Sequence, residues 1–414
     1  MSDSDVVIVG AGPNALSLAA HLRARRIDFR VFGPPMKFWR DMPSSLNLKS
    51  FAFATNVYVP DKGHTFPEWC RGRGLEDFEP CTMASFAEYG MEMKGRFVPD
   101  LDPTLVARVS VGATGRFEVA LADGRTIGAR RVVFATGLSH LAYTPEAFSG
   151  FPPELVSHTA DHSDYAFLRG KEVAVVGAGA SAIEAGALVH ESGGRVTILV
   201  RDSQAVFHTK MNPRRSLYAR LRAPNSVVGP GLTGRILQAF PIGPHFLPEP
   251  TRVRLTKRLL GPAAPWWITD RIVGRVPILV RTSVVGAERV GHRVRLRIRE
   301  AEGAERALDV DHVVAGTGFV PDVDRLEYLD PELRRRIRRL ERGPALSMNF
   351  ESSVPGGYFI GPITALGFGP IFRFVAGADY TAPALARHLA GRTGPVERIA
   401  RVFNATARPP ASAA

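Results

Sequence analysis

Apolar residues gather in two short runs that each end in a glycine-rich turn. Val6–Val9 precedes Gly10-Ala11-Gly12-Pro13-Asn14, and Val173–Val176 precedes Gly177-Ala178-Gly179-Ala180-Ser181-Ala182. Continuous apolar runs of this length are typical of buried parallel strands, and the small residues that follow permit a tight turn. Each segment is therefore predicted to fold as a strand, a turn and the start of a helix.

A second pattern, the alternation of apolar and polar residues, follows each of these segments. It occurs over Phe117–Leu121, before the turn Asp123-Gly124, and over Val294–Ile298, where arginines alternate with apolar residues. A period of two predicts half-exposed strands, here the strands of a β-meander. Each meander leads to a buried strand that ends in Thr136-Gly137 or in Thr317-Gly318.

The repeated order predicts an α/β protein with two Rossmann-like dinucleotide-binding domains, each carrying a β-meander. After Gly318, the segment Pro355–Pro362 has the pattern of a turn, a short strand and a further glycine turn, and Thr381–Leu389 has that of a closing helix. The second domain is therefore expected to be inserted into the first. Residues 204–278, rich in proline and glycine, are expected to form an insertion of short helices that covers the cleft. Trp266-Trp267 within it is interpreted as core or interface packing, with a substrate platform as the alternative.

The two turns have the chemistry of a pyrophosphate site. The first glycine makes the turn, the second lets backbone approach the phosphates, and a small third residue allows close helix–strand packing. Free N–H groups at the positive end of the following helix then bind the anion. The predicted cofactor contacts are Gly10, Gly12, Pro13 and Asn14 at the first turn, and Gly177, Gly179, Ser181 and Ala182 at the second. Two such sites in one chain indicate electron transfer between two dinucleotides.

Composition excludes several other classes. The chain has 414 residues, 45% of them apolar, and a net charge of +13. No apolar run approaches the roughly 20 residues that span a bilayer, and the polar N-terminus is not a signal peptide, so a cytoplasmic protein without membrane contact is expected. Leu333, Ile337 and Leu340 are expected to share one helical face, which leaves the arginines of 334–339 on a solvated face. No aromatic-rich strand or helix-turn-helix accompanies the charge, so nucleic acid is not an expected partner.

The cysteines and histidines of the sequence predict neither a disulfide framework nor a metal site. Cys70 and Cys81 do not form a CxxC motif, and we expect two reduced thiols. The histidines show no metal-ligand spacing, so no metal is predicted.

These motifs, in this order, resemble the class B flavin-dependent monooxygenases. Gly10–Leu16 is similar to the FAD turn of the N-hydroxylases, and Gly177–Ala182 to the NADPH turn of the group. Ala135-Thr136-Gly137 resembles the linker before the NADPH domain, and Asp311–Phe319 resembles the motif that closes it, although Gly316 stands where Ala is usual. The resemblance implies FAD and NADPH as cofactors. It also implies that Thr136, Gly137, Thr317 and Gly318 contact them.

The resemblance also implies a division of the chain and a reaction. Residues 1–165 and 319–405 would form a discontinuous FAD-binding domain, 166–318 the NADPH-binding domain, and 406–414 a flexible tail. NADPH would reduce FAD, and the reduced flavin would combine with O2 at C4a to give a (hydro)peroxide that hydroxylates a small nucleophile. An amine nitrogen is the preferred substrate atom. Oligomeric state stays open, and a homo-oligomer fits the resemblance.

Several single residues receive a role from the resemblance. Trp39 and Met42 contact the flavin or, equally, pack in the core. Asn56 donates to the flavin peroxide as a catalytic group or satisfies its own turn. The loop with Gly361, Pro362 and Gly369 approaches the pyrimidine edge of the flavin.

The residue after the second strand of each domain is the one expected to bind the ribose of the cofactor. Gly33 occupies the place where an acidic residue should bind the FAD ribose. Arg201, about twenty residues beyond the second turn, favours the 2′-phosphate of NADPH, unless it only caps the strand in solvent. Lys210, Arg214 and Arg215 would reinforce it.

Four alternatives stay open. Baeyer–Villiger oxidation of a ketone needs a tighter fingerprint than Phe148, Gly150 and His158 provide. Oxygenation of a heterocycle or of sulfur fits the same cofactors. A flavin disulfide reductase requires paired redox cysteines, for which Cys70 and Cys81 have the wrong spacing. A nucleotide-binding redox sensor without enzymatic activity is kept open by Gly33.

Overall fold

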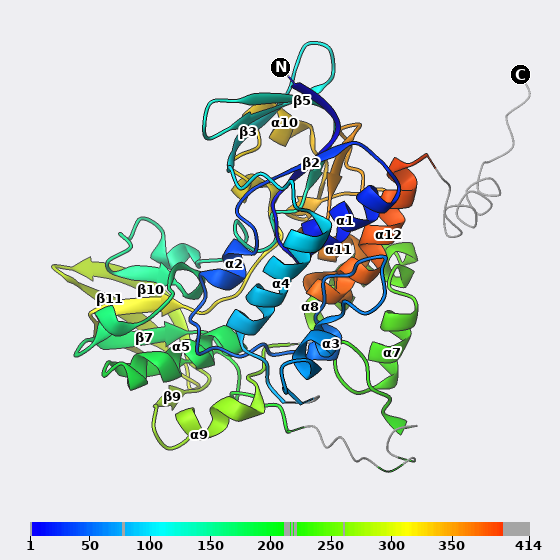
Figure 1. The fold of residues 1–414 in the computed structure, drawn as a ribbon. Coiled ribbons are helices and arrows are strands. Elements are labelled where there is room, and N and C mark those ends of the chain that lie inside the picture. Colours follow the sequence, from blue (N-terminus) through cyan, green and yellow to red (C-terminus); the bar gives the residue numbers. More distant parts are fainter. Residues whose placement is uncertain are drawn as a thin grey trace, which may run out of the picture.

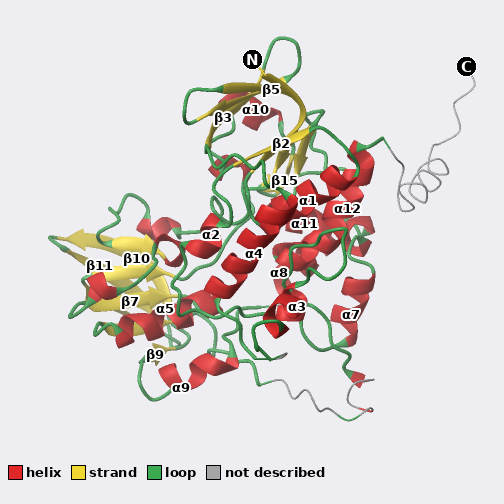
Figure 2. Ribbon diagram, viewed as in Figure 1, coloured by secondary structure: helices red, strands yellow, loops and turns green. Residues whose placement is uncertain are grey.

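The computed structural model describes residues 2–76, 79–210, 216, 218, 222–259 and 261–391 of the chain. Two large sheets, one mixed and one parallel, lie apart from one another, with helices packed on them and between them (Figures 1 and 2). Arg214, Arg215 and the predicted flexible tail 406–414 lie outside the described residues.

The first sheet has the strand order β2-β1-β5-β4-β3, and β16 pairs with β5. β5 belongs to both parts of this sheet, because it pairs parallel with β1 and β16 and antiparallel with β4. The parallel half is therefore continuous with the predicted meander. The strands are β1 (Ser2–Val9), β2 (Phe29–Phe32), β3 (Val106–Val111), β4 (Phe117–Leu121), β5 (Thr126–Phe134) and β16 (Gly357–Phe359).

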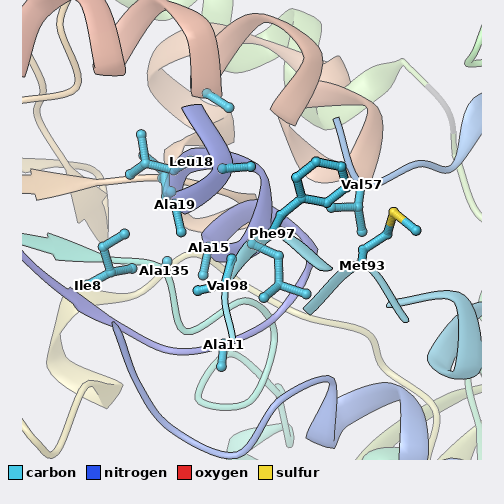
Figure 3. Close-up of a cluster of buried hydrophobic side chains, with 14 of the residues drawn as sticks. Ile8, Ala11, Ala15, Leu18, Ala19, Val57, Met93, Phe97, Val98 and Ala135 are labelled. Carbon is cyan, nitrogen blue, oxygen red and sulfur yellow. The ribbon is translucent and has the colours of Figure 1, made fainter. Parts of the chain in front are cut away.

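Helix α1 (Pro13–Ala24) is the centre of the first core. It packs against α4 (Met83–Phe97) and α12 (Ala378–Leu389) as well as on β2. Ala15, Leu18 and Ala19 of α1 are fully buried, and Figure 3 draws them in the same apolar cluster as Phe97 at the end of α4. The alanines allow close helix packing because they fill little space between the backbones.

The second sheet has the order β6-β13-β7-β8-β9, and every neighbouring pair in it is parallel. Helix α5 (Ala180–Glu191) connects β7 to β8 and buries its apolar face on them. A separate antiparallel sheet, β10-β11-β12, is the predicted second meander. These strands are β6 (Val156–His158), β7 (Glu172–Val176), β8 (Arg195–Leu199), β9 (Ile278–Leu279), β10 (Ser283–Val290), β11 (Arg293–Arg299), β12 (Glu305–Val310) and β13 (His312–Ala315).

The chain leaves the first sheet after β5 and returns to it at β16. One strand departs from the expected boundary at residue 165, because β6 pairs with β13 and lies in the second sheet. Its short length and lack of a glycine turn gave it no signal of its own in the sequence.

The insertion between β8 and β9 packs on the C-terminal part of the first module. It contains α7 (Leu232–Ala239), α8 (Glu249–Arg258) and α9 (Thr269–Ile272). His245 Nδ1 lies 3.0 Å from the carbonyl oxygen of Gly367, and Thr256 donates to the carbonyl of Ala365, both on α11 (Ala365–Phe368). The insertion therefore connects the two modules.

The arginine-rich segment differs from the single helix predicted for it. Helix α10 (Pro331–Arg336) ends early, and Arg339–Leu340 forms a short strand, β14, paired with β15 (Gly343–Pro344). Arg334 is half-buried and donates to the carbonyls of Leu326 and Leu329, at 3.0 and 2.9 Å. The guanidinium of Arg334 is thus hydrogen-bonded to backbone carbonyls, whereas the sequence predicted that it would face solvent.

Shorter elements complete the described part of the chain. The remaining α-helices are α2 (Lys37–Arg40) and α3 (Phe66–Arg71). The 3-10 turns are Ala52–Ala54, Glu146–Phe148, Thr159–Asp161, Ala166–Leu168, Gly243–Phe246, Trp266–Ile268, Val323–Arg325, Pro362–Thr364, Pro370–Arg373 and Val375–Gly377. Among the described residues, no helix is both long enough and apolar enough to cross a bilayer.

Candidate functional site

The first glycine turn combines one crowded and one open glycine. Gly10 has φ +106°, and a Cβ there would lie 2.6 Å from the carbonyl oxygen of Ala135, so only glycine fits. Gly12 is the N-cap of α1, and a Cβ on it would meet nothing within 4 Å. No side chain caps the helix, which begins with Pro13. No side chain therefore accepts a cap hydrogen bond from the first-turn N–H groups of α1.

The second turn repeats this arrangement. Gly177 has φ +142°, and a Cβ there would collide with the carbonyl oxygen of Gly316. Gly179 is the N-cap of α5, again without a capping side chain, and the nearest atom to a Cβ would be Pro262 of the insertion at 4.0 Å. Ser181 is half-buried in the first turn of α5, and Ala182 is fully buried.

The unusual Gly316 has a steric reason. A Cβ at this position would lie 2.5 Å from the Cβ of Ala182. Glycine therefore lets the end of β13 approach α5 closely. The departure from alanine at this position therefore affects packing.

The two Thr-Gly turns lie beside the glycine turns, since Ala135 and Gly316 directly precede them. The Thr136 hydroxyl is 3.2 Å from the Tyr328 hydroxyl, and that of Thr317 donates to the carbonyl of Tyr143. Gly137 and Gly318 have φ of +64° and +81°. The threonine side chains thus hold the ends of β5 and β13 in place.

The C-terminal loop reaches the first turn through Gly361. This glycine has φ +83°, and a Cβ on it would lie 3.3 Å from Nδ2 of Asn14, which is 8% exposed. Pro362 begins the next 3-10 turn. Gly369 instead meets the insertion, since a Cβ there would lie 2.7 Å from Pro244. The structure therefore brings Gly361 and Asn14 together and gives Gly369 a packing role.

The ends of the two second strands differ in exposure. Gly33, directly after β2, has φ +129°, and a Cβ there would lie 3.4 Å from Cα of Gly10. An acidic residue at this place would require a strained backbone against the glycine turn. Arg201, two residues beyond β8, is exposed to solvent.

The aromatic segment after β2 packs largely on itself and on α4. The ring of Trp39 meets that of Phe86 edge to face at 4.9 Å between centroids, and Trp39 is half-buried. Met42 is also half-buried. The contacts of Trp39 favour core packing, one of the two roles that the sequence left open for it.

Asn56 is fixed by bonds to distant parts of the chain, not by its own turn. Its Oδ1 accepts from the backbone N–H of Phe66, at 2.8 Å, and from the Tyr89 hydroxyl, at 2.6 Å. Both acceptor sites of the amide oxygen are therefore used, and the amide NH2 group stays available as a donor. The turn interpretation of Asn56 is wrong because its partners lie 10 and 33 residues away.

Two charged residues at the junction of the modules were missed by sequence reasoning. Lys49 is an exposed residue of the first module, and its Nζ donates to the carbonyl of Ala263 in the insertion, at 2.6 Å. Glu184 lies on α5 of the second module and is only 6% exposed. It makes no hydrogen bond within the described part of the chain. A single acid inside the apolar run Ala182–Ala187 was the signal that could have identified it.

The charges of this junction influence one another. Burial raises the pKa of Glu184 to about 7, and the cations Arg271 and Lys49 oppose this rise. Desolvation lowers the pKa of Lys49, while Glu184 acts in the opposite direction. Glu184 also raises the pKa of Tyr165, secondary to the burial of that ring. The junction therefore holds a carboxylate that titrates near neutral pH beside a cation from the other module. Across the described residues, no group of three or more His, Cys, Asp or Glu could hold a metal ion.

Comparison with known proteins identifies a matching family and several similar proteins. A family model described as pyridine nucleotide-disulphide oxidoreductase matches residues 4–223, more than half of the chain. An FAD-dependent urate hydroxylase of Xanthomonas campestris pv. campestris is 26% identical over 212 residues, 48% of this chain and 45% of that protein. The chain spans about half the length of the curated relatives it matches.

Solved structures with the same fold cover nearly the whole chain. Reduced ornithine hydroxylase PvdA from Pseudomonas aeruginosa has a TM-score of 0.73 at 16% identity, over 94% of this chain and 99% of that one. The ornithine N-hydroxylase of Kutzneria sp. 744, solved with reduced FAD, NADP+ and L-ornithine, has a TM-score of 0.70 at 19% identity over the same shares. The predicted fold class and the resemblance to flavin monooxygenases are confirmed.

Proposed function

Because the chain belongs to the pyridine nucleotide-disulphide oxidoreductase family, we propose that it is an NADPH-dependent FAD monooxygenase that hydroxylates the nitrogen of a small amine. One observation carries the proposal: two helices begin at uncapped glycines, each beside the Thr-Gly end of a buried strand. This arrangement fits two pyrophosphates in one chain.

The first site fits FAD. The open face of Gly12 leaves room for a phosphate group, and the first-turn N–H groups of α1 supply donors at the positive end of the helix dipole. Asn14 and Gly361 meet at the same helix start, so the C-terminal loop closes over it. Because Gly33 offers no carboxylate, we propose that backbone groups bind the FAD ribose.

The second site fits NADPH. Gly179 offers the same open cradle at the start of α5. Arg201 is exposed beyond β8, where its guanidinium can pair with a 2′-phosphate at the place an acid would take in an NADH site. We assign 1–155 with 319–391 to the FAD module and 156–318 to the NADPH module, since β6 belongs to the second sheet.

We place the reacting ends of the two cofactors at the junction that Lys49 and Glu184 mark. Bound FAD supplies a hydride acceptor for the nicotinamide and the means to activate O2. The chain's own groups bind and orient. Glu184 would offer its carboxylate as an acceptor at this junction. Asn56 would offer its NH2 group as a donor, because its Oδ1 already accepts from Tyr89. The insertion, held on α11 by His245 and Thr256, shields the junction from water.

The nitrogen of an amine is the proposed target because the N-hydroxylase structures match this fold along nearly the whole chain. Hydroxylation of a heterocycle is a second candidate, favoured by the relative named urate hydroxylase. Both use the same two cofactors, so a substrate panel separates them.

The decisive experiment exchanges each N-cap glycine for aspartate. Aspartate is a good N-cap and accepts from the first-turn N–H groups, so Gly12→Asp and Gly179→Asp should preserve α1 and α5 or stabilise them by about 0.3 kcal/mol. The same carboxylate repels a pyrophosphate. We expect Gly12→Asp to be purified without flavin absorbance. Gly179→Asp should stay yellow but show a greatly raised KM for NADPH.

Each variant is the control for the other, and circular dichroism should show both fully folded. The wild-type protein is then assayed for NADPH and O2 consumption with amines, heterocycles and ketones, and products are measured by mass. A gain of one oxygen atom on an amine nitrogen supports the proposal. A Gly12→Asp protein that binds FAD as well as the wild type would contradict it.

A further inference from the structure

Cys70 and Cys81 are brought into contact by the fold. Their Sγ atoms lie 3.6 Å apart, although ten residues separate them in the chain. Cys70 is near the end of α3, and Cys81 directly precedes Thr82, the N-cap of α4. Both are buried, with 2% and 3% exposure, in the first hydrophobic core. The sequence spacing, which argued against a redox pair, gave no indication of this contact.

We propose that Cys70 and Cys81 form an oxidisable dithiol that reacts with hydrogen peroxide to give an intramolecular disulfide. In the first step one thiol attacks peroxide: an S–O bond forms, the O–O bond breaks, and one water leaves with the thiol proton. In the second step the other sulfur attacks the sulfenic acid: the S–S bond forms and a second water leaves. Two thiols lose two electrons in total, and one peroxide becomes two waters.

The contact distance favours this outcome over deeper oxidation. A sulfenic acid on either sulfur would meet its partner without movement of the backbone, because the two atoms already touch. Condensation with a neighbouring thiol competes with oxidation to sulfinic acid. Closure from 3.6 Å to a bond of about 2.05 Å requires only side-chain rotation and small adjustments.

The disulfide would join two segments that the proposed function uses. The carbonyl of Cys81 accepts from the N–H of Leu48, at 2.7 Å, so Cys81 is paired with the residue next to Lys49. Helix α3, which carries Cys70, begins at Phe66, whose N–H donates to Asn56. Oxidation would therefore link the segments that position Lys49 and Asn56.

The source of the oxidant depends on the proposed function, because a flavin oxygenase that reduces O2 without substrate releases hydrogen peroxide. The site itself does not depend on it. Reagent hydrogen peroxide therefore tests the site, and NADPH-driven turnover with and without catalase tests the source. If reagent peroxide forms the disulfide and NADPH does not, the dithiol is supported, and turnover of the proposed oxygenase is excluded as the source of its oxidant.

The experiment uses the full chain, reduced, desalted without oxygen and treated with hydrogen peroxide. Trypsin cleaves after Arg71 and Arg73, between the two cysteines, so their peptides separate unless a disulfide joins them. We expect a linked pair of peptides, lighter by two hydrogen atoms than the two thiol peptides and released by dithiothreitol. The oxidised protein should also have a higher Tm, because the cross-link restricts the unfolded chain.

Cys70→Ser and Cys81→Ser are the matched controls. In each, the remaining cysteine has no partner sulfur, so we expect dimedone to trap a sulfenic acid on it and no linked peptide to form. The idea is overturned if both thiols of the folded wild type survive peroxide unchanged. It is equally overturned if oxidation yields only disulfides between molecules or isolated sulfinic acids.

Discussion

The buried carboxylate of Glu184 makes stability depend on pH in a defined direction. Replacement by glutamine keeps the shape of the side chain and removes its charge. In the folded protein burial raises the pKa of this group from 4.5 to about 7. Below pH 4.5 the group is protonated in both the folded and the unfolded chain, and glutamate and glutamine are equivalent in charge.

The magnitude follows from the two pKa values. At about 1.4 kcal/mol for each tenfold change in proton affinity, a change from 4.5 to about 7 corresponds to about 3 kcal/mol. A folded-state pKa that is raised contributes stability at low pH, and this contribution is lost as the pH rises from 4.5 through 7. The glutamine variant has no such loss. We therefore expect Glu184→Gln to be more stable than the wild type above pH 7, by up to about 3 kcal/mol.

Thermal and urea unfolding between pH 4.5 and 8 measure this effect. The stability difference between Glu184→Gln and the wild type should be near zero at pH 4.5 and grow steadily toward pH 8. Lys49→Met should increase the loss of stability with pH in the wild-type background, because Lys49 holds the pKa of Glu184 down. A difference that stays flat over this range, or a glutamine variant that is less stable at pH 8, would refute the reasoning.

Glu191→Gln is a control of opposite sign on the same helix. Its hydrogen bond to Arg271 holds the pKa of Glu191 below the usual range. The carboxylate therefore contributes stability above its unfolded pKa, and this contribution is lost as the pH falls. Removal of this charge should destabilise at neutral pH and have a smaller effect in acid.

Three further outcomes are expected. Arg201→Ser should raise the KM for NADPH about tenfold or more, because a charge-assisted hydrogen bond to phosphate is worth about 1.5–3 kcal/mol. The KM for NADH should stay nearly unchanged, and steady-state assays with both nucleotides measure the two values. Gly177→Ala should lower the free energy of unfolding by more than about 2 kcal/mol, measured in urea, since the added methyl collides with Gly316 at φ +142°. Tyr89→Phe should cost about 1–2 kcal/mol in the same assay, because it removes one of two donors to Asn56 Oδ1, and an unchanged midpoint would refute that role.

Much of the fold could be predicted because its signals are local. The apolar runs of β1 and β7 and the alternation in β4 and β11 were read correctly, since burial follows the period of each strand. The signal failed where pairing was long-range. β6 has three residues and owes its place to β13, which lies more than 150 residues later. Helix α10 ends where β14 pairs with β15, against the helical period of the leucines.

The candidate site divides in the same way. By itself the sequence determined the two glycine turns, because the backbone at Gly10 and Gly177 must adopt conformations that other residues avoid. Only the tertiary structure decided which residues from distant parts of the chain come together. Asn14 approaches Gly361, Tyr89 donates to Asn56, Lys49 and Glu184 influence each other's pKa, and Cys70 touches Cys81. The physical reason is that the backbone conformation of a tight turn restricts which residues can occupy its few positions. A contact between distant residues depends on how whole sheets and helices stack, which no short stretch of sequence encodes.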